Sequence, residues 1–393
     1  MMNTFSTMKP VRNSWTAVIA VGLATFSVVT TEMLPVGLLT SIAGTLSITT
    51  GSAGLMISLP ALLAALFAPV VVIASGGIDR RRILCGLLAL LVIANLASAL
   101  APNLILMLAA RILVGFCIGG IWAIAGGLAS RLVQENAIGL ATSIIFGGVA
   151  AASVLGVPLG AFIGDVIGWR WAFGIMTIFS ALVLVFHLAV IPALPVTGST
   201  NISQFIAQLG NRKIRAGLIL TLLLVTSHFV AFTFVRPLLI SVSGFETQWI
   251  SAILFAYGVA GITSNFLAGI TAARYTIFTL IVIATGLVLT PLLFITTGQS
   301  VTGGGGVLIF WGLAYGGLSV GLMTWMIKAA PRAVEISAAL YVGVFNTGIA
   351  LGSWTGGQVA DMLALTDTLW LACGLATAAL LLAVATGLNR GDR

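Results

Sequence analysis

The chain has 393 residues, of which 60% are hydrophobic and only 7% are charged, against roughly 25% charged residues in an ordinary soluble domain. This composition excludes a soluble globular enzyme, because so few charges cannot cover a surface that faces water. Lys and Arg outnumber Asp and Glu by 17 to 9, for a net charge of +8. The basic residues lie at the ends of apolar runs and are not clustered with stacking aromatics, so nucleic-acid binding is not expected.

Runs of roughly 20 apolar residues are long enough to cross a lipid bilayer as helices. Twelve such runs follow one another along the chain: 15–39, 51–75, 83–101, 104–128, 138–163, 170–192, 214–236, 247–270, 276–297, 303–327, 335–359 and 366–388. The sequence therefore predicts an all-α membrane protein with twelve transmembrane helices.

The basic residues predict the orientation of these helices. Of the 17 Lys and Arg residues, Arg111 lies inside a span, Arg170 and Arg236 fall on one side of the membrane, and the other fourteen fall on the opposite side. Basic loops stay in the cytoplasm, so both termini are predicted to be cytoplasmic. We expect a multi-pass protein of the bacterial inner membrane.

A polar break near the middle of the chain predicts two halves. The predicted domains are a six-helix bundle over 1–195, a cytoplasmic linker over 196–213 with a short interfacial helix at 202–209, and a second six-helix bundle over 214–393. A shift of 196 residues places three residues of the first half on three of the second. These are Gly156, Gly160 and Asp165, which fall on Gly352, Gly356 and Asp361. We interpret the halves as a parallel repeat.

Two charged residues lie well inside predicted spans, Glu32 in the first and Arg111 in the fourth. Each is about seven residues from the outer end of its helix, or roughly 10 Å below the membrane boundary at 1.5 Å per residue. A charge in hydrocarbon costs several kcal/mol, so such residues pair or face a polar cavity. Glu32 is the candidate proton carrier, and Pro35 should bend its helix and free backbone carbonyls nearby. The alternative is a static ion pair that fixes helix packing.

Polar and aromatic residues near the middle of the spans are candidates for contact with a substrate: His228, Tyr315, Asn346, Trp122 and Phe232. For each aromatic residue the alternative is ordinary helix packing, and for His228 it is a neutral ring bonded to a neighbouring helix. Gly156, Pro158 and Gly160 mark a bend in a glycine-lined span. No metal site, cofactor site or catalytic signature is predicted.

Four segments resemble a known family. They are G-G-I-D-R-R-R at 76–82, R-I-L-V-G-F-C-I-G-G from Arg111, S-V-L-G-V-P-L-G-A-F-I-G at 153–164 and G-W-R-W-A-F at 168–173. In order and in topology they resemble the major facilitator superfamily, in its twelve-helix drug:proton antiporter branch. The resemblance implies a gating contact at Asp79 and Arg80, although the first segment lacks the Gly and spacer that follow the first Arg in the family pattern.

Two further segments, T-E-M-L-P-V-G-L-L at 31–39 and F-V-R-P-L at 234–238, are similar to the sugar and purine-nucleoside efflux proteins of that branch. This resemblance implies export of a small polar solute in exchange for protons, with Glu32 and Arg111 as coupling residues. A monomer in the lipid bilayer is expected. The alternative is a facilitator or importer of the same fold, with a structural pair of Glu32 and Arg111.

Overall fold

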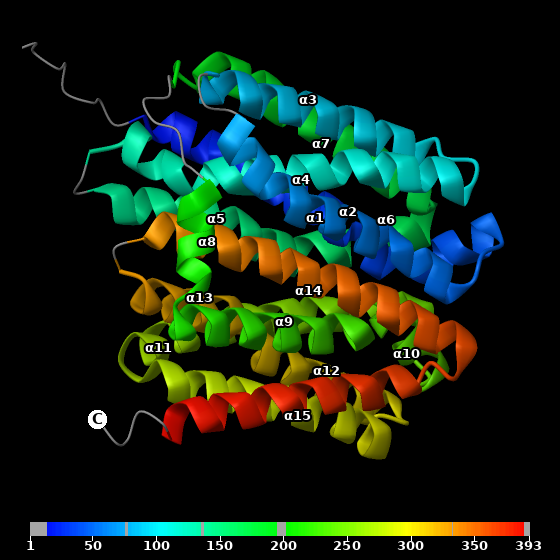
Figure 1. Cartoon of the computed structure of the whole chain (residues 1–393). Coiled ribbons are helices and arrows are strands. Elements are labelled where there is room, and N and C mark those ends of the chain that lie inside the picture. Colours follow the sequence, from blue (N-terminus) through cyan, green and yellow to red (C-terminus); the bar gives the residue numbers. More distant parts are fainter. Residues whose placement is uncertain (1–13, 75–77, 135–136, 195–201, 332, 389–393) are drawn as a thin grey trace, which may run out of the picture.

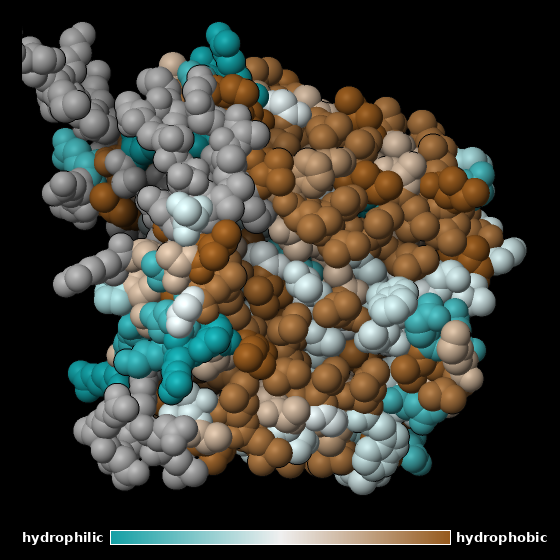
Figure 2. All heavy atoms as spheres, viewed as in Figure 1, coloured by the Kyte–Doolittle hydropathy of each residue, from teal (hydrophilic) through white to brown (hydrophobic). Residues whose placement is uncertain are grey.

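A computed structural model describes residues 14–74, 78–134, 137–194, 202–331 and 333–388. Over these residues the chain is helical, and eleven helices are long and apolar enough to cross a membrane. The long helices run side by side, and hydrophobic side chains cover their flank while hydrophilic ones gather at the two ends (Figures 1 and 2). The prediction of an all-α membrane protein is confirmed.

The helices of the first part of the chain are α1 (Trp15–Leu46), α2 (Thr50–Ala74), α3 (Arg80–Ala99), α4 (Leu104–Leu132), α5 (Ile138–Ala151), a π-helical turn (Ala152–Gly156), α6 (Val157–Ile167) and α7 (Trp169–Val190). The fifth predicted span is found as a candidate membrane crossing, and the helix is irregular near Pro158, where a bend was predicted. Pro158 has no N–H, and its ring crowds the carbonyl of Val154. A π-helical turn widens the backbone just before it.

The second part contains α8 (Ile202–Leu209), α9 (Arg212–Phe232), α10 (Val235–Ser241), α11 (Thr247–Thr297), α12 (Val301–Gly316), α13 (Leu318–Ala329), α14 (Val334–Met362) and α15 (Asp367–Leu388). The short helix predicted at 202–209 is confirmed, whereas residues 195–201 of the predicted linker lie outside the described residues. Two spans predicted as continuous are broken. The seventh ends at Phe232 and resumes as α10, and the tenth is divided at Gly317.

Helix α11 is 51 residues long, and Tyr275 is non-helical (φ −125°, ψ 57°). A straight helix of that length would measure roughly 77 Å, far more than a bilayer is thick. In the first part of α11, Ala260 lies near Gly312 and Ala268 lies near Gly317. In the second part the order is reversed, because Leu280 lies near Gly321 and Gly286 lies near Ala314. The two parts of α11 therefore run in opposite directions along α12 and α13. The loop predicted between 270 and 276 is replaced by this sharp reversal.

Lys328 stabilises the reversal. Its Nζ donates to the carbonyl oxygens of Ala272 (3.2 Å) and Ala273 (2.7 Å) and to Thr276 Oγ1 (2.9 Å). These carbonyls belong to the last turn before Tyr275, where a helix that ends leaves acceptors without intrahelical donors. A cation at this position also complements the helix dipole.

The two ends of the helix array differ in how the core is built. We call the end where α1 begins and α15 ends the terminal end, on the left in Figure 1, and the other the far end. One core cluster contains buried residues of α1 from Leu34 onward together with residues of α9 to α15. The other contains Ala17–Val29 of α1 and residues up to Leu194 only. The apolar core therefore crosses between the two halves of the chain toward the far end.

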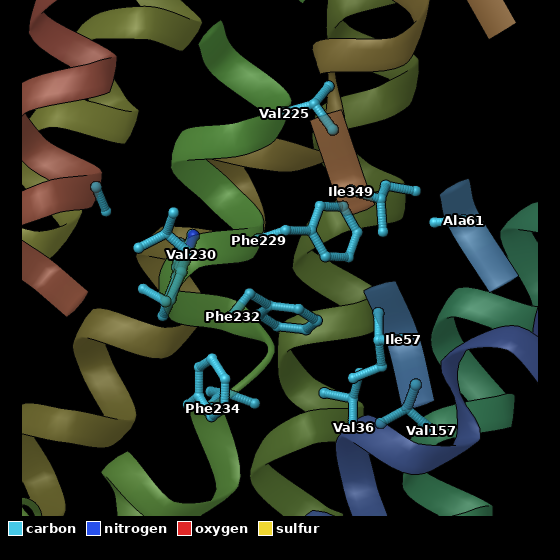
Figure 3. Packing of buried hydrophobic residues seen from close by; sticks show 14 of the residues in the cluster. Val36, Ile57, Ala61, Val157, Val225, Phe229, Val230, Phe232, Phe234 and Ile349 are labelled. Atoms are coloured by element: carbon cyan, nitrogen blue, oxygen red, sulfur yellow. The ribbon is translucent and has the colours of Figure 1, made fainter. Parts of the chain in front are cut away.

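We call the contact surface between the two halves of the chain the seam, and part of it is visible at close range. Figure 3 shows Phe229 of α9 and Ile349 of α14 beside Ile57 and Ala61 of α2. These side chains are buried, so the seam between the halves is packed here by contacts of the ordinary core type.

Glycine contacts repeat at the spacing of 196 residues. In the first half Gly156 packs on Thr30 of α1 and Gly160 on Leu34. In the second half Gly352 of α14 packs on Thr226 of α9, and Gly356 packs on Val230. All four contacts obey the same shift, and Glu32 and His228 occupy equivalent positions under it. The sequence repeat is thus matched by a repeat of helix packing.

Candidate functional site

The site in the first half is built around Pro35 of α1. A proline at position 35 leaves the carbonyl of Thr31 without an intrahelical donor. Arg111 of α4 supplies the missing donor, because its Nη1 lies 2.9 Å from Thr31 O. Arg111 is completely buried, and Glu32, next to Thr31, is 4% exposed. The proline thus accounts for the position of the intramembrane arginine.

Side chains from two more helices, α3 and α7, complete this polar centre. Asn95 of α3 donates to Thr31 Oγ1 (3.1 Å) and to Ser180 Oγ of α7 (3.2 Å). Ser180 also bonds Ser27 of α1 at 2.8 Å. All of these side chains are buried. The sequence analysis did not nominate Asn95 or the serines, because single neutral polar residues in apolar spans carry little signal.

Glu32 and Arg111 do not form the ion pair that their equal depth suggested. Within the described residues the ion pair found is that of Asp165 and Arg236. Glu32 and Arg111 interact electrostatically but have no N–O contact within 4 Å. Glu32 Oε1 and the Nε and Nη2 atoms of Arg111 are buried without a hydrogen-bond partner. Unsatisfied buried polar atoms of this kind are unusual and point to a functional or solvent-bridged site.

The arginine is held on its other side by an aromatic ring. The Cζ atom of Arg111 lies 5.2 Å from the ring centroid of Phe173 in α7. Phe173 is fully buried, so this cation–π contact is sheltered from water, where such contacts are strongest. It offsets part of the cost of burying the guanidinium.

The candidate residues of the second half form a stack of aromatic rings. His228 of α9 lies between Tyr315 of α12 (centroids 3.4 Å apart, planes at 9°) and Phe232 (4.6 Å, 24°). Phe232 stacks in turn on Tyr257 of α11 (4.7 Å, 27°). Trp311 donates its indole N–H to His228 Nδ1 at 3.0 Å. Three of the predicted cavity residues are therefore brought together.

Tyr315 connects the two halves of the site. It lies close enough to Glu32 and to Tyr341 of α14 to interact electrostatically with both. The carboxyl in α1 and the end of the aromatic stack thus interact electrostatically across the seam between the halves. Tyr257 and Tyr341 were not nominated from the sequence, since a tyrosine in a span gives no sign of which way it faces.

Two other predicted residues lie apart from this stack. Asn346 is buried on α14, and its amide donates to the carbonyl of Val342 in its own helix (2.9 Å). Trp122 of α4 packs on Phe146 of α5, with ring centroids 5.9 Å apart. The structure therefore does not bring Trp122 together with His228 and Tyr315.

Two polar clasps join the halves at the far end. Arg236 of α10 is 1% exposed and contacts Asp165 of α6 with Nη2–Oδ1 at 2.5 Å. It also donates to Thr40 Oγ1 (2.7 Å) and Gly37 O (2.6 Å) of α1. The sequence placed Arg236 at the end of the seventh span, on the same side of the membrane as Arg170, with no partner expected. In the structure the short helix α10 carries the arginine into the seam.

The second clasp uses the residue equivalent to Asp165 in the repeat. Asp361 of α14 accepts hydrogen bonds from Thr49 Oγ1 (2.6 Å) and from the backbone N–H of Gly51 (2.9 Å) at the start of α2. Each half therefore contributes one carboxylate to the other, and the two clasps are related by the internal repeat.

Asp79 and Arg80 lie at the terminal end. Asp79 Oδ1 caps α3 by accepting from Arg81 N (2.8 Å), and it also accepts from Leu194 N (2.9 Å). The Leu194 N–H is the main reason that the pKa of Asp79 is lowered, with smaller contributions from Arg81 and Arg82. Arg80 N donates to Leu194 O at 3.1 Å. These contacts attach the start of α3 to the end of α7 within the first half.

Pro158, predicted to mark a bend, follows the π-helical turn, and Gly156 and Gly160 receive α1 side chains as described above. Within the described residues no group of three or more His, Cys, Asp or Glu is arranged to hold a metal ion.

A family model described as Major Facilitator Superfamily matches residues 21–357. The chain belongs to the major facilitator superfamily. Members of this family are membrane transporters and not enzymes, and the resemblance read from the sequence motifs is confirmed.

Three relatives show how far the likeness extends. The chain is 30% identical to the purine ribonucleoside efflux pump NepI of Salmonella paratyphi A over 93% of its own length and 92% of the relative. It is 33% identical to the uncharacterized MFS-type transporter YfhI of Bacillus subtilis over 90% of each chain. It is 31% identical to a Pseudomonas aeruginosa protein named transcription regulatory protein OpdE, over 96% of this chain and 95% of the relative.

Solved structures share the superfamily fold at low identity. A bacterial homologue of the human lysosomal transporter Spinster matches with a TM-score of 0.75 and 15% identity, over 96% of this chain and 97% of the other. The human organic anion transporter MFSD10 matches with a TM-score of 0.68 and 17% identity, over 96% and 100%. This transporter therefore has the fold of a multi-pass membrane carrier along nearly its whole length.

Proposed function

We propose that this transporter is a proton-coupled antiporter that exports a small polar solute, a purine nucleoside or a related compound, by alternating access. The observation that carries the proposal is the buried Glu32 carboxyl, which lies in the seam between the halves, next to Arg111 but not paired with it. A carboxyl in an apolar wall changes its proton affinity when a conformational change exposes it to water, which couples protonation to transport.

The substrate class rests on two features. The relative NepI is named a purine ribonucleoside efflux pump. In this chain, Tyr315 interacts electrostatically with Glu32, and Tyr341 and Tyr257 each interact with Tyr315. Aromatic rings and hydroxyl groups are therefore available next to the tyrosine that Glu32 meets. Aromatic rings stack on planar bases, and hydroxyl groups and a carboxyl can bond the hydroxyls of a sugar.

The topology we propose has twelve membrane crossings, with the two antiparallel parts of α11 counted separately. The excess of Lys and Arg at the terminal end supports a cytoplasmic position for that end and for both termini, in a bacterial inner membrane. The domains are the bundles over 1–195 and 214–393, joined by the linker over 196–213. The transporter works as a monomer, since substrate passes between the two bundles of one chain.

In this topology the far end faces the outside, and the clasps of Asp165 and Asp361 hold it closed. The shared core at the same end supports this assignment. Transport then requires that both clasps open while the terminal end closes. Glu32 lies on the seam that this movement would expose to the outer solution.

The alternative is a facilitator or importer of the same fold in which Glu32 and Arg111 are a structural ion pair. Their buried atoms without partners argue against a purely structural role, because a static pair would satisfy them.

The test is transport into proteoliposomes with an imposed pH gradient, using radiolabelled inosine as the probe. Wild-type protein should drive inosine against its concentration gradient in exchange for protons. Glu32→Gln keeps the shape of the side chain and removes the titrating group. It should abolish pH-driven accumulation while inosine binding and inosine–inosine exchange persist.

Glu246→Gln is the matched control, because Glu246 is exposed in the loop before α11 and should transport as wild type does. Uphill accumulation by Glu32→Gln would rule out Glu32 as the proton carrier. If wild-type protein neither accumulates inosine nor exchanges it under the pH gradient, inosine is not a substrate.

A further inference from the structure

A small cavity lies inside the second half, beside the aromatic stack. The centre of a water molecule has about 10 Å³ available in it, close to what one water requires. Its walls come from α9, α11, α12 and α15, and are formed by Ser227, His228, Ala231, Leu287, Pro291, Trp311, Leu369 and Ala372. Most of this lining is apolar. Ser227 Oγ donates to Ala372 O at 2.7 Å and Trp311 donates to His228, which leaves Nε2 of His228 as the side-chain polar atom without a partner.

The proton on His228 can be assigned from its hydrogen bond. Trp311 has only a donor to offer, so the Nδ1 atom that receives its N–H must carry a lone pair. In a neutral imidazole the proton is then on Nε2. His228 is 2% exposed, and its Nε2 is buried without a protein partner. Nε2–H is therefore a donor that needs an acceptor, and a metal cation at this position is excluded.

Pro291 accounts for the hydrogen-bond acceptor of the site. It lies inside α11 and has no N–H, so the carbonyl of Leu287 loses its intrahelical donor. Both residues line the cavity. Pro35 and Thr31 O form the same arrangement in the first half, where Arg111 donates to the freed carbonyl. In the second half no side chain donates to Leu287 O within the described residues.

We infer that one water molecule occupies this cavity, accepts from His228 Nε2–H and donates to the freed carbonyl of Leu287. The two unmatched groups are a donor and an acceptor, and a water molecule can serve both at once. Neither group alone would hold it. The ligand is water, because the space is too small for an organic solute and the histidine presents a proton.

The water fixes the imidazole in one tautomer and one orientation. The ring of His228 then supports the ring of Tyr315, whose centroid lies 3.4 Å away and which interacts electrostatically with Glu32. His228 is thus a positioning residue for Tyr315, and while Trp311 donates to Nδ1 it does not carry a transported proton. The effect on transport rests on the proposed function, whereas the water site itself does not.

Nitrogen-15 NMR tests the water site directly. The chain contains two histidines, so His187→Gln with a tag free of histidine leaves His228 alone in full-length protein in lipid. We expect an unprotonated Nδ1, a protonated Nε2 and a magnetisation-transfer peak between Nε2–H and water. A protonated Nδ1, or an Nε2–H with no transfer from water, would overturn the inference whatever the protein transports.

Two isosteric variants test what the water does. Ala372→Thr and Ala372→Val both fill the cavity and displace the water, but only threonine supplies an oxygen for Nε2–H. In both, the water peak should disappear. Threonine should keep the wild-type tautomer and an inosine KM within about twofold, while valine should perturb the tautomer and raise KM about tenfold with a smaller change in kcat. Equal tautomers and equal KM values in the two variants would contradict the positioning role.

Discussion

Two prolines explain how single polar residues are placed in apolar helices. Pro35 frees Thr31 O for Arg111, and Pro291 frees the carbonyl of Leu287, a residue that lines the same cavity as His228. In each case the backbone supplies an acceptor at a defined depth without adding a charge, which would cost several kcal/mol in hydrocarbon. Sequence inspection found the Pro35 effect next to Glu32, but it could not identify Arg111 as the donor.

At the same scale, Asp79 should make stability depend on pH. Because its folded-state pKa is lowered, mainly by the Leu194 N–H, its stabilising contribution is complete at neutral pH. That contribution should be lost as the pH falls below about 4, the ordinary carboxyl range. Asp79→Ala should lower the free energy of unfolding by about 1 kcal/mol at pH 7, as for loss of a helix cap.

Thermal unfolding of the detergent-solubilised protein from pH 7 to pH 3 measures this. The difference in Tm between wild type and Asp79→Ala should shrink as the pH falls. A difference that stays constant down to pH 3 would mean that the Asp79 carboxylate contributes nothing through its charge.

At the scale of the elements, glycine positions decide how closely neighbouring helices approach. An added methyl group on Gly352 would lie 2.6 Å from Thr226 O, which is backbone, whereas on Gly160 it would meet only side-chain atoms, Cδ1 and Cγ of Leu34. A side-chain tip can rotate away, but the backbone of a packed helix cannot. Both glycines lie where two helices touch, but Gly160 should tolerate an added methyl group better than Gly352.

We therefore expect Gly352→Ala to reduce the free energy of unfolding by about 1–3 kcal/mol, the usual cost of overpacking. Gly160→Ala should be close to neutral. Gly306→Ala is the control, because nothing lies within 4 Å of the added methyl group, and it should gain about 0.5–1 kcal/mol from helix propensity. Chemical denaturation in detergent measures all three, and a Gly352→Ala protein as stable as wild type would show that α9 and α14 separate at no cost.

At the scale of the whole molecule, Asp165 and Asp361 control the balance between two states of the far end. Each clasp joins the halves through a carboxylate. Loss of the partly buried pair of Asp165 and Arg236 costs about 2 kcal/mol or more, which corresponds to roughly a 30-fold change in an equilibrium ratio. Asp361 is exposed and accepts only neutral hydrogen bonds, so its loss should have a smaller effect of the same sign. Asp165→Asn and Asp361→Asn should therefore each shift the population toward a far end that is open.

Spin labels at Thr45 of α1 and Thr247 of α11, both exposed and on opposite halves, report this opening when the native cysteines are replaced. Each Asp→Asn variant should populate a longer distance, and the double variant more so. Asp367→Asn is the control, because Asp367 bonds the nearby Ala364 N within its own half and should leave the distances unchanged. Wild-type distances in both clasp variants would show that other contacts hold the far end closed.

The sequence by itself determined that this is a helical membrane protein of the major facilitator superfamily, with an internal repeat and a buried acid and arginine. Hydrophobic runs, charge placement and motif order depend on residues that are close together in the sequence, so they can be recognised without the structure. Only the tertiary structure decided which groups meet: that Arg111 bonds Thr31 O and not Glu32, that Arg236 enters the seam, and that His228 stacks with Tyr315. Those outcomes depend on how helices far apart in the sequence pack against one another, and a helix buried on every side carries no periodic pattern that says which face meets which neighbour.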